Sequence, residues 1–187
     1  MTTASIAERQ QQAAERIREA GINLRDDEIA QIEIADFGLG RFEEIGLAIH
    51  VYVNTDRYCA KELAMVPGQI CPEHWHPEID GEPGKQETFR VRSGVCHLFL
   101  PGVPKSEGYD NAAKFWPEDK RDCFAVCRQV TLRPGEQYTI DPDTPHWFVA
   151  GEEGCVVSEF SSRSRDEYDL FVDKAIVRMA GEGPHPG

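Results

Sequence analysis

The chain has no excess of positive charge, because 20 Lys and Arg residues stand against 33 Asp and Glu residues, a net charge of −13. Nucleic acids and anionic membranes both require a basic face on their protein partners. The same balance disfavours a phosphorylated substrate, unless one pocket concentrates the basic residues. We therefore expect neither a nucleic-acid partner nor a membrane partner.

Long apolar runs and closely paired cysteines are also missing. No segment approaches the roughly 18 apolar residues that a membrane-spanning helix needs. Residues 1–10 lack the basic start and following apolar run of an export signal. The six cysteines form no CxxC pair, and most stand in apolar segments, where reduced buried thiols are usual. These absences predict a cytoplasmic protein without a disulfide framework.

Helical patterns occur only near the two ends of the chain. Ser5 and Glu8 form a capping-box pattern, S-x-x-E, ahead of a helix expected over 5–20. A second, shorter helix is expected over about 25–32. The apolar residues that follow Arg165 predict a C-terminal helix.

Between these ends the sequence has the pattern of β-strands. Apolar residues alternate from Leu47 to Val53, a period of two that predicts a strand. Further apolar segments follow at short intervals, separated by turn residues such as Pro67-Gly68. The strands expected are 47–53, 57–66, 70–76, 86–92, 95–100, 123–132, 137–140, 145–149 and 155–160, with a long loop over 101–121. Many short strands with turn signals indicate a sandwich or barrel.

The length of 187 residues is that of one domain with a substantial core. We expect three parts: an N-terminal helical segment over 1–45, an all-β barrel over 46–162, and a C-terminal helix and tail over 163–187. The Gly- and Pro-rich end, 181–187, is expected to be frayed.

Two histidines one residue apart, His74 and His76, are the strongest functional signal. Residues two apart on a strand point to the same face, so both imidazoles would aim at one point. Glu87 follows eleven residues later, and His146 stands alone further on. Three imidazoles and one carboxylate suit a borderline or hard divalent ion. The alternative is a pair of surface histidines in a proline-containing loop.

The spacing around these residues resembles a known superfamily. Its first motif is matched by Gly68, His74, His76, Glu87 and Gly94, with an insertion ahead of the glutamate. The chain thereby resembles the cupins, and a second cupin motif is matched more loosely by Gly135, Pro142 and His146. The resemblance implies an all-β fold, a cupin-type β-barrel or jelly roll, with the N- and C-terminal helices flanking it.

Within the cupins, residues 22–165 resemble the D-lyxose isomerases, a family of small metal-dependent ketol-isomerases. The matching segments are Val51–Leu63, Cys71–Pro77, Gly84–Arg90, Gln137–Ile140, Thr144–Phe148 and Glu159–Ser162. The resemblance implies metal ligands at His74, His76, Glu87 and His146. It also implies an acid–base pair formed by Lys85 and Glu159.

The implied reaction interconverts D-lyxose and D-xylulose, and also D-mannose and D-fructose, by proton transfer through a cis-enediol. Mn²⁺ is the expected ion, and Zn²⁺, Ni²⁺, Co²⁺ or Fe²⁺ could occupy the same site. Lys85 and Glu87 share a strand face by parity, so the bound cation should lower the pKa of Lys85. Glu159 would be the carbon base. Lys61, on a neighbouring strand, is expected to reach a hydroxyl of the free sugar.

Several alternatives stay open at this point. Lys85 could be a solvated turn lysine beside Gly84, and Glu159 could belong to a structural ion pair. The same ligands would also serve an iron-dependent cupin dioxygenase, a sugar-phosphate isomerase or a non-catalytic binding module. An acid–base pair favours the isomerase, because oxygen chemistry does not need one. Barrels of this kind commonly pair their edge strands, so we expect a homodimer.

Overall fold

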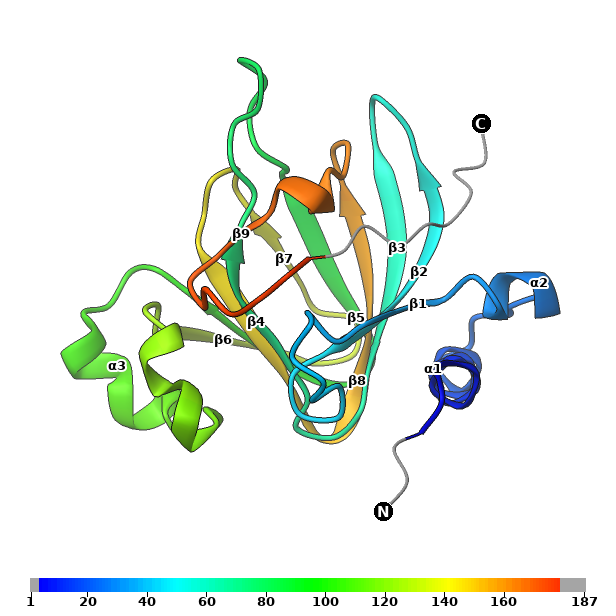
Figure 1. Cartoon of the computed structure of the whole chain (residues 1–187), viewed down its shortest axis with the longest axis horizontal. Coiled ribbons are helices and arrows are strands. Elements are labelled where there is room, and N and C mark those ends of the chain that lie inside the picture. Colours follow the sequence, from blue (N-terminus) through cyan, green and yellow to red (C-terminus); the bar gives the residue numbers. More distant parts are fainter. Residues whose placement is uncertain (1–3, 179–187) are drawn as a thin grey trace.

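The computed structural model describes residues 4–178 and shows one antiparallel nine-stranded sheet curved into a half-open barrel (Figure 1). The hydrogen-bonded order is β1-β2-β3-β8-β4-β9, and β5 pairs with β6, β7 and β8. The strands are β1 (Glu33–Ala35), β2 (Leu47–Asn54), β3 (Cys59–Met65), β4 (Ile70–Trp75), β5 (Glu87–Leu100), β6 (Arg128–Leu132), β7 (Gln137–Ile140), β8 (His146–Ser161) and β9 (Leu170–Phe171). The all-β fold class is confirmed.

The N-terminal helices lie beside β1–β3, on the side of the barrel opposite α3 (Figure 1). The helices are α1 (Ile6–Glu19), α2 (Asp26–Ile29) and α3 (Lys105–Ala112), with 3-10 turns at Glu118–Cys123 and Asp166–Tyr168. The capping box of α1 is confirmed, since the Ser5 N–H donates to Glu8 Oε2 at 2.6 Å and the Glu8 N–H donates to Ser5 Oγ at 3.3 Å. The second helix is shorter than expected. No helix in the described part of the chain is long and apolar enough to cross a membrane.

The two longest strands run through glycines where the sequence predicted strand ends. β5 was expected as two strands separated near Gly94, and β8 as two separated near 151–154. Both are continuous, because glycine allows a bulge without ending the pairing. Gly94 has a φ of +68°, and a Cβ there would lie 2.0 Å from the Gly154 carbonyl oxygen. The close approach of the two backbones therefore requires glycine.

The expected loop over 101–121 contains α3 and the start of a 3-10 turn, and it packs against the outside of the barrel. Its apolar side chains, including Trp116, join Phe124, Phe99 and Trp147 in one cluster. The strand expected over 123–132 begins only at Arg128, and the short strand β1 was not predicted. All six cysteines are free thiols, and five of them are buried, as expected.

The expected C-terminal helix is wrong over residues 165–178. A 3-10 turn and the strand β9 lie there instead, and β9 pairs with β4 through Phe171 and His74. We call residues 164–178 the strap. An extended chain is favoured over a helix because it places Asp166 and Asp169 against basic groups inside the barrel. The end of the expected helix and the tail over 179–187 lie outside the described residues. The boundaries at 46 and 162 stay a prediction.

The interior of the barrel is apolar at one end and polar at the other. On β3, Leu63 and Met65 join the apolar core, whereas Lys61, on the same inner face, reaches the polar end. On β8, Val157 lies in the core and Glu159 at the polar end. Strand alternation places these residues on one face, and their distance along the strand decides whether they meet apolar or charged neighbours.

Candidate metal centre and polar cavity

Three imidazoles meet at the polar end of the barrel. His74 lies near the end of β4, His76 just beyond it, and His146 begins β8, where it pairs in register with His74. One ring nitrogen from each side chain lies within 4.8 Å of the others, and all three residues are buried. The triad could therefore hold a metal ion.

Each of these rings also makes one contact that orients it. Nδ1 of His74 lies 2.8 Å from the Pro72 carbonyl oxygen, Nδ1 of His146 lies 2.9 Å from that of Thr144, and Nδ1 of His76 lies 2.5 Å from Asp169 Oδ1. A ring that donates through Nδ1 keeps the lone pair of Nε2 for a ligand bond. Nε2 of His146 is buried, and its neighbour is a carboxylate oxygen at 2.9 Å. This donor set fits a divalent cation.

Glu87, the first residue of β5, completes the expected ligand set. Its Oε1 lies 2.9 Å from His146 Nε2 and 3.3 Å from His76 Nε2. Burial raises the pKa of this carboxyl, but Lys85 and His76 outweigh burial and hold the pKa well below its usual range. The structure thus brings all four predicted ligands together, with a carboxylate anion beside three imidazoles.

The imidazoles themselves differ in their electrostatics. Burial lowers the pKa of His74 well below its usual value, and the neighbouring His146 and His76 lower it further. Burial and Lys85 also lower the pKa of His76, but Glu87 and Asp169 more than compensate and raise it to about 9. A neutral His74 is ready to act as a ligand, whereas a metal ion at His76 must displace a proton.

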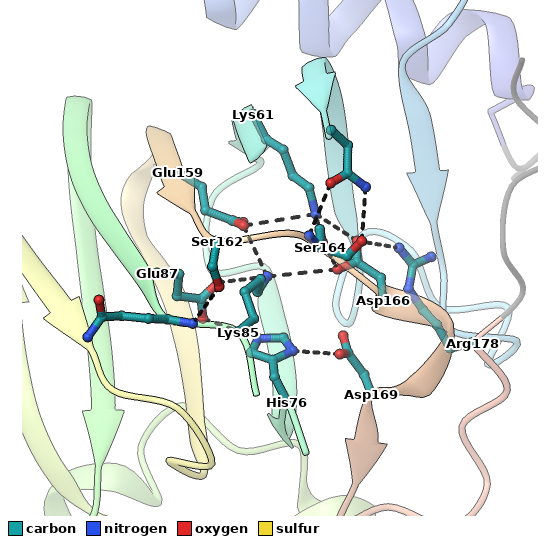
Figure 2. A network of polar contacts seen from close by, with 12 residues as sticks. Lys61, His76, Lys85, Glu87, Glu159, Ser162, Ser164, Asp166, Asp169 and Arg178 are labelled. Carbon is teal, nitrogen blue, oxygen red and sulfur yellow. Dashed lines mark hydrogen bonds and ion pairs between the residues drawn. The ribbon is translucent and has the colours of Figure 1, made fainter. Parts of the chain in front are cut away.

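Lys85 and Glu159 form a buried pair next to this triad. Lys85 Nζ lies 3.0 Å from Glu159 Oε1 and 2.8 Å from Glu87 Oε2 (Figure 2). Lys85 is only 7% exposed, so it is not a solvated turn lysine. Lys61 pairs in register with Glu159 across β3 and β8, and its Nζ lies 3.9 Å from Glu159 Oε1. The three residues predicted beyond the metal ligands are therefore neighbours.

The lowering of the Lys85 pKa by a bound cation stays a prediction, and the carboxylates around this ammonium act on the pKa in the opposite direction. Burial does lower it, but Glu159, Glu87 and Asp166 outweigh burial and hold the pKa well above its usual value. The sequence prediction considered one cation beside this ammonium. The fold surrounds the ammonium with carboxylates instead, two of them on β5 and β8 and one on the strap.

The strap supplies charged residues that sequence reasoning missed. Asp166 Oδ2 accepts a hydrogen bond from Lys61 Nζ at 2.7 Å, and Asp166 Oδ1 lies 3.8 Å from Lys85 Nζ (Figure 2). Arg178 lies 3.6 Å from Asp166 and also pairs with Glu33 of β1. The residues missed are Ser164, Asp166, Asp169 and Arg178. Their local sequence contains no metal-ligand or acid–base spacing, so only the path of the strap reveals them.

Most of these side chains line one cavity with a volume of about 40 Å³. Its polar lining includes His74, His76, Lys85 and Glu159. Its apolar lining is formed by Phe37, Leu47, Ile49, Leu63, Phe89, Phe148 and Phe171. A small molecule that carries both hydroxyl and C–H groups matches such a lining.

The antiparallel barrel and its buried histidine triad define a cupin-like protein with a candidate metal site. The ligand-free L-ribose isomerase of Cellulomonas parahominis has the same fold, with a TM-score of 0.72 at 18% identity over 94% of this chain and 96% of that chain. The L-ribose isomerase of Acinetobacter sp. DL28 in complex with L-ribose gives a TM-score of 0.71 at 17% identity, with the same coverage of both chains. At these identities the likeness establishes the fold alone.

Sequence comparison identifies the family. Residues 7–181 match the family model described as D-lyxose isomerase. A D-lyxose/D-mannose isomerase of Thermosediminibacter oceani is 51% identical over 93% of this chain and 94% of the relative. A D-lyxose ketol-isomerase of a Thermofilum species is 50% identical over 96% and 97%. The chain belongs to the D-lyxose isomerase family.

Proposed function

We propose that this protein is a D-lyxose ketol-isomerase that interconverts D-lyxose and D-xylulose, and also D-mannose and D-fructose. The observation that carries the proposal is the buried Lys85–Glu159 pair, 3.0 Å apart and adjacent to the histidine triad. The names of the relatives, at about half identity over nearly the whole chain, support the same activity.

The reaction moves a proton between C1 and C2 of the sugar, and that proton is only weakly acidic. One divalent ion, held by His74, His76, His146 and Glu87, would supply the Lewis acid that polarises the carbonyl. We propose Mn²⁺ in function, while zinc or nickel can replace it after purification because both bind nitrogen ligands more tightly.

The chain's own residues supply the proton transfers. Glu159 takes the proton from one carbon and returns it to the other on the same face, which defines a cis-enediol intermediate. Lys85 exchanges protons with the sugar oxygens, because its ammonium lies beside Glu159 and Glu87. Lys61 binds a sugar hydroxyl from the neighbouring strand. The buried setting of all three groups keeps the reacting atoms oriented, and the proton held by Glu159 can exchange with water while the enediol lasts.

A direct assay tests the activity. The purified protein is incubated with Mn²⁺ and a panel of free aldoses, in H₂O and in D₂O. We expect D-lyxose and D-mannose to be converted to their ketoses, with deuterium at C1 of the product. Complete retention of the original hydrogen over many turnovers would favour a hydride shift, and no turnover of either sugar would contradict the function.

The same experiments separate the competing functions. Turnover without oxygen contradicts an iron-dependent dioxygenase, because that chemistry consumes oxygen. A sugar-phosphate isomerase would need a basic side chain beside the cavity that is not already paired with a carboxylate. Each basic side chain described there, Lys61, Lys85 or Arg178, has a carboxylate oxygen within 4.0 Å. We therefore expect no preference for phosphorylated sugars.

The proposal includes a cytoplasmic homodimer. β1 pairs with β2 only along residues 47–49, so in the described chain residues 50–54 pair on the β3 side alone. Val51 and Tyr52, each 41% exposed, lie on this open edge. An apolar open edge is a template for pairing with a second copy. A monomeric mass at micromolar concentration would contradict the dimer.

A further inference from the structure

Phe37 has a backbone conformation that aromatic residues rarely adopt. Its φ is +56°, in the left-handed region that favours glycine. The other non-glycine residues of the described chain with positive φ are Asp80 and Asp143, whose short polar side chains tolerate this region well. An aromatic residue stays there only when its surroundings over-determine the conformation, and such residues cluster at functional sites.

Several contacts hold Phe37 in this conformation. Its carbonyl oxygen accepts a hydrogen bond from the Val177 N–H of the strap at 3.0 Å. On the other side, the Gly38 N–H donates to Asp36 Oδ1 at 3.0 Å. Gly38 also packs tightly on Val177, since a Cβ at the glycine would lie 3.3 Å from the valine Cβ. The turn after β1 and the end of the strap therefore fix each other.

The ring of Phe37 lines the cavity one aromatic ring away from the metal triad. Phe171 stacks on His74 with ring centroids 5.6 Å apart, and Phe37 packs on Phe171 at 5.7 Å. In the strand order, β8 with Glu159 and β3 with Lys61 lie between β4 with His74 and β1, which Phe37 follows. Phe37 thus lines the cavity on the side of β1, with Phe171 between its ring and His74.

This lining constrains any sugar that reacts there. With its C1 and C2 held at the triad and Glu159, the rest of its carbon chain must use the apolar part of the cavity, which includes Phe37. Phe37 is held by its backbone contacts and is 5% exposed, so its ring is a fixed part of the cavity lining.

We propose that the ring of Phe37 closes the far end of the sugar site and sets the length of the carbon chain that the site accepts, favouring five-carbon over six-carbon aldoses. The inference rests on the isomerase function proposed above. An additional hydroxymethyl group would meet an apolar ring that offers no hydrogen bond. Steric contact and an unsatisfied hydroxyl would both weaken its binding in the transition state.

The test is the ratio of kcat/KM for D-mannose to that for D-lyxose, measured on one preparation of each variant. The ratio cancels any loss of folded enzyme. We expect Phe37→Ala to raise the ratio about tenfold, as one methylene-sized group typically does, and Phe37→Trp to lower it. Phe37→Leu should raise it less, and this variant keeps the core filled if the alanine variant does not fold.

Phe42→Ala is the matched control. Phe42 is buried in the cluster that α1 covers and does not line the cavity, so its loss should destabilise the fold and leave the ratio unchanged. Ratios within twofold of wild type in Phe37→Trp and in the smaller variants would overturn the inference. Wild-type protein inactive on both sugars would instead overturn the proposed function on which it rests.

Discussion

The two faces of strands β3 and β8 carry two buried carboxylates in contrasting settings. On the inner face, Glu159 is 4% exposed and lies 3.0 Å from Lys85 Nζ. On the outer face, Glu62 is 3% exposed and accepts hydrogen bonds from the hydroxyls of Ser158, at 2.7 Å, and Tyr52, at 3.3 Å. The two glutamates are equally buried, yet only the inner one touches an ammonium and faces the cavity.

The difference shows that burial by itself does not identify a catalytic carboxylate. Glu62 is one residue from Lys61 on β3, and Ser158 is one residue from Glu159 on β8, so alternation sends each neighbour to the opposite face. Burial raises the pKa of Glu62, and its hydrogen bond to Ser158 and the nearby Arg92 only partly oppose this. We therefore expect mutations on the inner face to affect catalysis and mutations on the outer face to affect stability.

The largest effect is expected from removing a ring of the triad. In His146→Ala both bound metal and isomerase activity should fall sharply, because the site loses one of its three imidazoles. Metal content by mass spectrometry and turnover of D-lyxose measure the two losses. His97→Ala is the control, because His97 contacts Thr131 and Gln129, remote from the triad. Full metal occupancy and turnover in His146→Ala would contradict the ligand assignment.

The inner and outer glutamates can then be compared directly. Glu159→Gln keeps the size of the side chain but removes the base, so turnover should fall by about 10²–10⁴-fold while the metal stays bound. Glu62→Gln is the matched control, with activity within twofold of wild type. Initial rates and metal content are measured for both variants. If Glu159→Gln is fully active, this residue has no part in the chemistry.

A smaller effect is expected in the strap. Asp169 Oδ1 lies 2.5 Å from His76 Nδ1 and orients that ring. Asp169→Asn should weaken metal binding by about 10–100-fold, as loss of such an outer partner typically does. Calorimetric titration of the metal-free protein measures the affinity. Asp173, on the same strap, accepts a hydrogen bond from Lys120 instead, so Asp173→Asn should leave the affinity unchanged. Equal affinities in the two variants would show that Asp169 does not act on His76.

The smallest effect concerns the stability of the outer face. A folded-state pKa of Glu62 above its unfolded value gives stability that is full below the unfolded pKa and is lost as pH rises through the folded pKa. Glutamine cannot ionise, so Glu62→Gln should not lose stability as the pH rises. The variant should therefore be more stable than wild type at pH 7–8, and this difference in stability should vanish or reverse near pH 4. Urea denaturation at both pH values measures it. A difference that does not depend on pH would contradict the assignment.

Much of the fold was predictable from local pattern. The S-x-x-E box defined the start of α1, since a capping box needs only residues within one turn. Alternation predicted most of the strands, because the side chains of a strand repeat every two residues. The same rule predicted strand ends near Gly94 and 151–154, where β5 and β8 in fact continue. Glycine occurs both at bulges within paired strands and at turns that end strands, so the pattern alone does not separate the two cases.

The sequence by itself determined that His74 and His76 would aim at one point, because the direction of side chains along a strand is local. It also supplied Glu87, His146, Lys85 and Glu159 through their resemblance to a family. Only the tertiary structure decided how the strap crosses the barrel and which carboxylates meet Lys85 and Lys61. The physical reason is that electrostatic interactions depend on distance through space, and the charges that set them come from segments far apart in the chain.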